Sequence, residues 1–172
     1  MILNIHGFAG KSTNTNYSIL TELGCSVISP QLDYEAETVE ETYKKLSKLV
    51  SENDITQIVA TSYGSFFGKL LGTQYNIPLL ATNPCLRPDI SLAAIASEYV
   101  YKNRKAISKI ARENSCSDFS DDCFILGDND TVIDHAITRN IAKNAIIEVV
   151  PGGHSLELQP CVIETFRRLL QK

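Results

Sequence analysis

The chain has 172 residues, enough for one folded domain, 1–172, with a substantial buried core. Its hydrophobic content of 44% and charged content of 21% are typical of globular proteins. The net charge of −4 argues against nucleic acid or an anionic membrane surface as a partner, because both need a basic patch. No run reaches the ~18 apolar residues that a membrane helix requires.

Cysteine usage adds to this picture. The five cysteines are an odd number, none forms a Cys-x-x-Cys pair, and no His or Cys lies at metal-ligand spacing. The first residues show no basic segment of the kind that opens a signal peptide. We therefore expect reduced thiols, no metal site, no cofactor and a cytoplasmic location.

Six short apolar runs, rich in Ile, Val and Leu, predict six buried β-strands. Runs that are apolar on both faces are typical of a parallel sheet covered on both sides. In chain order they are residues 1–5, 25–30, 55–60, 77–82, 123–127 and 145–150.

Helical patterns lie between these runs. Apolar spacings of three and four predict helices over 36–50, 63–74, 91–112 and 160–170. Asp33 is the expected N-cap of the first, Asn103 is a candidate break in the third, and Pro160 suits the first turn of the last. This alternation predicts a three-layer α/β/α sandwich with a mostly parallel six-stranded sheet.

The stretch NIHGFAGKST, residues 4–13, has two interpretations. A phosphate-binding loop needs a glycine five residues before Gly10, but Ile5 stands there, and a β-branched residue resists that turn. The alternative is a loop that stabilises an oxyanion. His6 and Gly7 follow a strand, where open α/β sheets place their sites, and such a loop supplies backbone N–H donors. We favour this second interpretation, with His6 as a structural loop residue.

A candidate nucleophile lies in the sequence Ala60-Thr61-Ser62-Tyr63-Gly64, between a predicted strand and a predicted helix. This is the position of the nucleophile elbow, normally Gly-x-Ser-x-Gly, in which a strained turn needs small flanking residues. Gly64 fits the pattern. Ala60 departs from it, although one methyl group can be accommodated.

The remaining partners of such a serine follow in the order acid then histidine. Asp128, Asp130 and Asp134 come after the fifth strand, and His154 lies on a glycine-rich loop after the sixth. We favour Asp130 over Asp128 as the acid, expect Asp134 to cap the helix that follows, and interpret His135 as a surface or helix residue. A neutral His154 could then take the proton of Ser62 while the aspartate holds the imidazole tautomer.

These stretches together resemble the α/β-hydrolase superfamily, and more closely the small bacterial esterases of the YqiA type. The matching segments span nearly the whole chain: IHGFAGKSTNTNYSIL, PQLDY, ATSYGSFFGKLL, ATNPCLRP, LGDNDTVIDH and PGGHSLEL. The resemblance implies a triad of Ser62, Asp130 and His154. It also implies an oxyanion hole made by two backbone N–H groups: that of Phe8, on the loop that His6 and Gly7 begin, and that of Tyr63, directly after Ser62.

The resulting hypothesis is an ester hydrolase that acts on a small-molecule acyl ester through an acyl-enzyme, as a monomer or homodimer. A thioesterase or acyltransferase with the same triad, and a catalytically degenerate binding protein, are the alternatives. Leu86, Arg87 and Tyr99 are candidate pocket residues, whereas Phe66 and Phe67 fit the core better. Residues 89–120 form a candidate small lid.

Overall fold

The computed structural model describes residues 1–171 of the chain. Within these residues six β-strands form one sheet in the order β2-β1-β3-β4-β5-β6, and every neighbouring pair is parallel. Each strand falls in or overlaps one of the six apolar runs, so the predicted parallel sheet is confirmed. The strands are β1 Ile2–Ile5, β2 Val27–Ile28, β3 Gln57–Thr61, β4 Leu79–Thr82, β5 Cys123–Gly127 and β6 Ile146–Val150.

The same part of the chain contains seven helices. The helices predicted over 36–50, 63–74 and 160–170 are confirmed with slightly different ends. The first helix, α1, is not evident in the sequence, because its short buried stripe includes the polar Asn16. The helices are α1 Thr15–Glu22, α2 Val39–Glu52, α3 Gly64–Tyr75, α4 Pro88–Ser91, α5 Ser97–Ser115, α6 His135–Ile141 and α7 Pro160–Leu169.

The predicted N-cap of α2 is wrong. Thr38 caps this helix: its side chain accepts a hydrogen bond from the Glu41 N–H, and the Glu41 carboxylate accepts one from the Thr38 N–H. This reciprocal pair satisfies two backbone donors at the helix start. Asp33 instead accepts from the Ala36 N–H in the turn before the helix.

The predicted break at Asn103 is also wrong. Asn103 lies buried inside α5, and the interruption of the predicted helix over 91–112 falls earlier, between α4 and α5. The buried amide is tolerated because it donates to the Tyr99 carbonyl and accepts from the Val39 N–H of α2.

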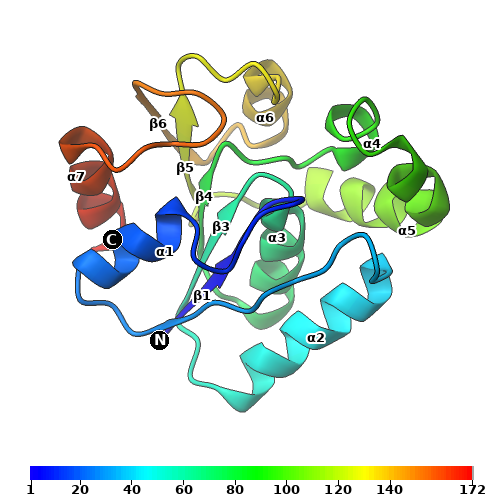
Figure 1. Ribbon diagram of the computed structural model, residues 1–172, viewed down its shortest axis with the longest axis horizontal. Coiled ribbons are helices and arrows are strands. Elements are labelled where there is room, and N and C mark those ends of the chain that lie inside the picture. Colours follow the sequence, from blue (N-terminus) through cyan, green and yellow to red (C-terminus); the bar gives the residue numbers. More distant parts are fainter. Residues whose placement is uncertain (172) are drawn as a thin grey trace.

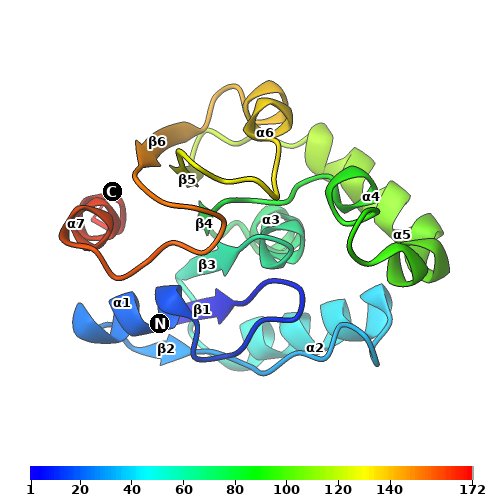
Figure 2. The same ribbon diagram turned by 45° about the horizontal axis from the view of Figure 1, so that its top comes forward.

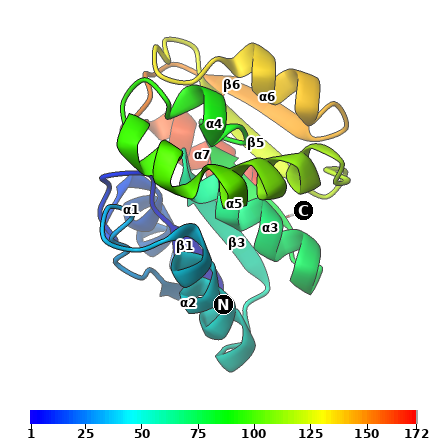
Figure 3. The same ribbon diagram turned by 90° about the vertical axis from the view of Figure 1, so that its right-hand side faces the viewer.

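Helices cover both faces of the sheet, which makes the predicted three layers (Figures 1 and 2). On one face α1 and α7 bury Ile19 and Phe166 against the strands. On the other face α2, α3 and α5 bury Leu46, Phe67 and Ile107. Figure 3 looks onto this second face. Each such side chain contributes about 1.5–3 kcal/mol through burial.

The parallel sheet brings the carboxyl ends of its strands to one edge, where open α/β sheets place their sites. The loops after β1, β3, β4, β5 and β6 carry His6, Ser62, Asn83, Asp130 and His154 respectively. A cavity of about 600 Å³ lies at the opposite edge, beside Lys69 and Asp122. Among residues 1–171, no helix is long and apolar enough to cross a membrane, and no group of His, Cys, Asp and Glu is arranged to hold a metal ion.

Candidate active site

Ser62 lies on a sharp turn between β3 and α3. Its φ of 49° is in the left-handed region, which is strained for a residue with a side chain and recurs at functional sites. The turn is held because α3 begins directly at Gly64, where an added methyl group would lie 2.5 Å from the Ile5 carbonyl oxygen. Only glycine allows this close approach of helix and strand. Ala60, at the other small position, is fully buried.

Two hydrogen bonds link Ser62, His154 and Asp130 in a chain, with His154 in the middle. His154 Nε2 lies 3.0 Å from Ser62 Oγ, and His154 Nδ1 lies 3.0 Å from Asp130 Oδ2. The carboxylate can only accept, so Nδ1 carries the proton and Nε2 is free to accept the proton of the serine hydroxyl. The histidine side chain is 26% exposed and the aspartate side chain 0%, so the imidazole faces solvent while its partner is sealed.

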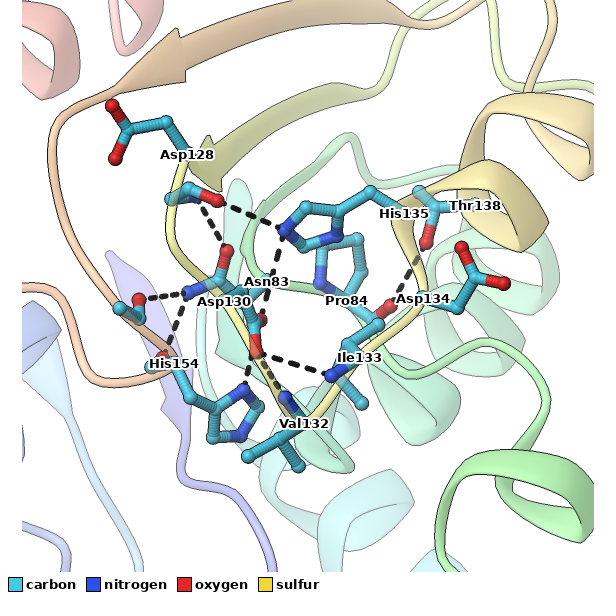
Figure 4. Close-up of polar contacts among 12 residues, drawn as sticks. Asn83, Pro84, Asp128, Asp130, Val132, Ile133, Asp134, His135, Thr138 and His154 are labelled. Carbon is cyan, nitrogen blue, oxygen red and sulfur yellow. Dashed lines mark hydrogen bonds and ion pairs between the residues drawn. The ribbon is translucent and has the colours of Figure 1, made fainter.

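The local fold explains why Asp130, and neither Asp128 nor Asp134, meets the histidine. Asp130 Oδ1 accepts from the N–H groups of Val132 and Ile133, which fixes the carboxylate and leaves Oδ2 for His154 (Figure 4). Asp128 is exposed and accepts from the Gly152 N–H. Asp134 caps α6 through the Ala136 N–H, as predicted.

The loop after β1 lies against the serine. A methyl group at Gly7 would lie 3.0 Å from Ser62 Cβ and 3.6 Å from Ser62 Oγ. Among residues 1–171, the backbone N–H groups of Phe8 and Tyr63 donate to no protein acceptor. Phe8 directly follows Gly7 and Tyr63 directly follows Ser62, so both unpaired donors belong to residues next to the serine turn.

His6 has a structural place in this loop. Its buried ring donates from Nδ1 to the Gly7 carbonyl at 2.8 Å, and Nε2 accepts from the Leu32 N–H at 3.0 Å. Tyr34 donates to the His6 carbonyl at 2.7 Å. Burial lowers the pKa of His6, opposed by the bond to Gly7 and aided by the nearby Lys45 charge. The neutral ring ties the loop to the segment after β2.

The candidate pocket residues differ in their surroundings. Leu86 is buried, and Arg87 is half-buried in a two-point ion pair with Asp89. Tyr99 of α5 shares a 2.9 Å hydroxyl contact with Tyr63. Burial raises the pKa of Tyr99 to about 12, so both phenols stay neutral. Phe66 and Phe67 are fully buried in the core.

Two residues beside the site, His135 and Asn83, make contacts that the sequence did not predict. The ring of His135 turns toward Asp130: its Nε2 lies 3.2 Å from the Gly127 carbonyl oxygen and 3.7 Å from Asp130 Oδ2 (Figure 4). Asn83 links the loops of the aspartate and the histidine. The sequence signal for Asn83 is the Asn-Pro pair after the fourth predicted strand, which indicates either a position that shapes the pocket or a structural turn.

The fold is that of solved α/β-hydrolases over nearly the whole chain. A monoacylglycerol lipase from Paleococcus ferrophilus has a TM-score of 0.71 and 14% identity, with 98% of this chain and 91% of that chain covered. The alpha/beta hydrolase MGS-MChE2, from a sediment metagenome of the lagoon of Mar Chica, Morocco, has a TM-score of 0.69 and 20% identity. The match covers 99% of this chain and 88% of that chain. BorB, a type II thioesterase from the borrelidin biosynthetic cluster, has a TM-score of 0.66 and 15% identity. The match covers 99% of this chain and 91% of that chain.

Together with the loop geometry, these similarities define an α/β-hydrolase fold. The family follows from a closer match: residues 1–157 fit the model of the Uncharacterised protein family (UPF0227), and the chain belongs to that family. The predicted resemblance to the α/β-hydrolases is thereby confirmed. No relative was found among curated protein sequences.

Proposed function

We propose that the protein is a serine hydrolase that cleaves carboxylic esters. The observation that carries this proposal is the chain from Ser62 through His154 to Asp130, with two hydrogen bonds of 3.0 Å. A serine on a strained strand-to-helix turn, a histidine that can accept its proton, and a buried aspartate behind the histidine are the parts that nucleophilic acyl transfer needs.

In the first half of the reaction, Ser62 Oγ attacks the ester carbonyl while His154 Nε2 takes the serine proton. Asp130 keeps the Nδ1 proton in place and stabilises the cation that forms on the ring. The N–H groups of Phe8 and Tyr63 donate to the oxyanion, and each such donor stabilises the transition state by about 3–4 kcal/mol. Collapse breaks the carbon–oxygen bond, and His154 protonates the departing alcohol.

In the second half, water attacks the acyl-enzyme with His154 again as base, and Ser62 leaves with its proton restored. This scheme draws on side chains and backbone groups of the chain and needs no cofactor. Leu86, Arg87 and Tyr99 are the proposed pocket residues. Residues 89–120, which include α4 and α5, are the proposed small lid, because the Tyr99 ring of α5 lies 5.2 Å from the Phe8 ring.

The test is labelling with a fluorophosphonate probe, which reacts only with an activated serine. Ser62→Ala should abolish labelling. Ser65→Ala is a matched control, because Ser65 is a buried serine three residues after Ser62, in the first turn of α3, whose hydroxyl has no partner among the described residues. Equal labelling of the wild type and Ser62→Ala, or no labelling of folded wild type, would overturn the proposal in favour of a binding protein.

Substrate class is then decided by matched panels. Esters and thioesters of the same acyl chains should separate the esterase from a thioesterase, because the two share every residue above and differ only in the leaving group. We expect ester turnover to exceed thioester turnover at equal chain length. The reverse order would assign the site to thioesters.

A further inference from the structure

The loop that follows β4 contacts the turn of the nucleophile. The Ser62 N–H donates to the Thr82 carbonyl at 3.0 Å, and the Cys85 N–H donates to the Ser62 carbonyl at 3.1 Å. Both backbone groups of Ser62 are therefore bound by residues on either side of Asn83. The position of the nucleophile and the position of Asn83 are fixed relative to each other.

The side chain of Asn83 binds the other two loops of the site. Its Oδ1 accepts from the Gly127 N–H at 2.7 Å, at the start of the loop of Asp130. Its Nδ2 donates to the carbonyl oxygens of Gly153 at 3.0 Å and His154 at 2.7 Å (Figure 4). Asn83 is 0% exposed and has a φ of 45°, and its own N–H donates to the Ile125 carbonyl.

The partners of Asn83 dictate the chemistry of its side chain. One partner is a backbone N–H, which can only donate, and two are carbonyl oxygens, which can only accept. A side-chain amide offers an acceptor and two donors at once, whereas a carboxylate offers acceptors alone. A buried acceptor or donor left without a partner is costly, so the three bonds hold both loops to this one residue.

The loop after β5 and the loop after β6 also contact each other closely. A methyl group at Gly127 would lie 2.5 Å from the Gly152 carbonyl oxygen and 2.6 Å from the Gly153 carbonyl oxygen. The catalytic geometry depends on this contact, because His154 reaches Ser62 and Asp130 through only two side-chain hydrogen bonds. Its main chain must be anchored elsewhere.

We propose that Asn83 is a positioning residue that holds the loops of Ser62, Asp130 and His154 in mutual register. This inference rests on the proposed function and deepens it. Asn83 does not touch the reacting atoms; it fixes the backbone from which the imidazole extends. A displacement of about 1 Å in such a group can lower the rate by a factor of about 100.

The test compares Asn83→Asp and Asn83→Ala with the wild type. The aspartate has the same shape and keeps the acceptor for the Gly127 N–H, but it loses both donors and faces two carbonyl oxygens. We expect fluorophosphonate labelling of Asn83→Asp to be 10- to 100-fold slower, with kcat lowered and KM within about twofold for ester substrates.

A pH series gives a readout that a loss of stability alone does not produce. Burial beside two carbonyl oxygens raises the pKa of the introduced carboxyl group, and its protonated form regains one O–H donor. The labelling rate of Asn83→Asp relative to wild type should therefore rise as pH falls. Asn83→Ala, which has no group to protonate, should show a constant ratio.

Asp122→Asn is the matched control for stability. It makes the same exchange of carboxylate and amide in reverse, in a buried network with Lys69 and the Leu79 N–H at the opposite edge of the sheet. It should lower the melting temperature and leave the labelling rate unchanged. Labelling of folded Asn83→Asp at the wild-type rate would overturn the proposal.

A failure of the proposed function can be told apart from a failure of this inference. The chain has three histidines, so the ring C–H signals in a proton–carbon NMR spectrum can be assigned with His154→Gln. In Asn83→Asp the His154 signal should broaden or split while the His6 signal remains single. If the wild type does not label but this change occurs, the positioning role stands without the hydrolase; an unchanged His154 signal refutes it.

Discussion

Replacing Gly64 by alanine tests whether α3 and the loop after β1 are pressed together at the nucleophile turn. The new methyl group would lie 2.5 Å from the Ile5 carbonyl oxygen and 2.7 Å from the His6 carbonyl oxygen. Both are backbone atoms, so neither can rotate aside. The His6 carbonyl also accepts the hydrogen bond of the buried Tyr34 hydroxyl, which a shift of the loop would break.

The expected loss follows from these two effects. Overpacking against fixed atoms costs about 1–3 kcal/mol, and the broken hydrogen bond costs about 1 kcal/mol more. The sum of roughly 3 kcal/mol lowers the melting temperature of a chain of this length by about 10 °C. The serine turn moves with the helix, so fluorophosphonate labelling should fall as well.

Gly68→Ala is the matched control on the same helix. Its methyl group would meet the end of the Leu79 side chain at 2.9 Å and the Ala60 and Ile58 side chains at 3.4 Å. Leu79 can yield, and alanine favours a helix by about 1 kcal/mol over glycine, so the net change should stay within about 1 kcal/mol. Urea denaturation measures both variants. A Gly64→Ala protein as stable as Gly68→Ala would show that α3 and the loop after β1 are not in close contact at Gly64.

Three further predictions concern individual side chains. Asp130→Asn should lower kcat by about 10⁴-fold through the wrong imidazole tautomer, whereas Asp128→Asn should stay within tenfold; equal losses in an ester assay would contradict the assignment. Because the pKa of His6 is lowered in the folded protein, the unfolded chain binds more protons below the ordinary value of 6.5, and the free energy of unfolding should fall as pH drops below that value. In urea titrations at pH 7.5 and 5.5, this fall should be smaller for the His6→Gln protein. Lys69→Met leaves the buried Asp122 unpaired and should cost about 3–5 kcal/mol in urea unfolding, unlike the exposed Lys48→Met.

Local pattern was sufficient for much of this protein. Apolar runs with turn residues between them predicted the strands, because a strand buried on both faces must be apolar throughout. The order of Ser62, Asp130 and His154 pointed to one sheet edge, because parallel strands end together there. Pro160 marked the start of α7, because proline suits the first helical turn.

Local pattern failed where a distant partner satisfied a polar group. Asn103 was predicted to break a helix, but it lies inside α5. Its side-chain oxygen accepts a hydrogen bond from the Val39 N–H of α2, so the buried amide is satisfied there. Asp33 was the predicted cap of α2, but the reciprocal hydrogen bonds between Thr38 and Glu41 place the start of the helix at Thr38. The ring of His135 turned toward Asp130 for a similar reason, because the Gly127 carbonyl is the acceptor for its N–H.

The layers of the fold and the residue types of the candidate site could therefore be predicted from the amino-acid sequence. The spacing of apolar residues and the positions of glycines shape the backbone near them, and both are visible in the sequence. The aspartate that faces His154 and the partners of Asn83 become visible in the three-dimensional structure. The bonds of Asn83 reach across 44, 70 and 71 positions of the sequence, and a hydrogen bond depends on distance in space, which no local pattern encodes.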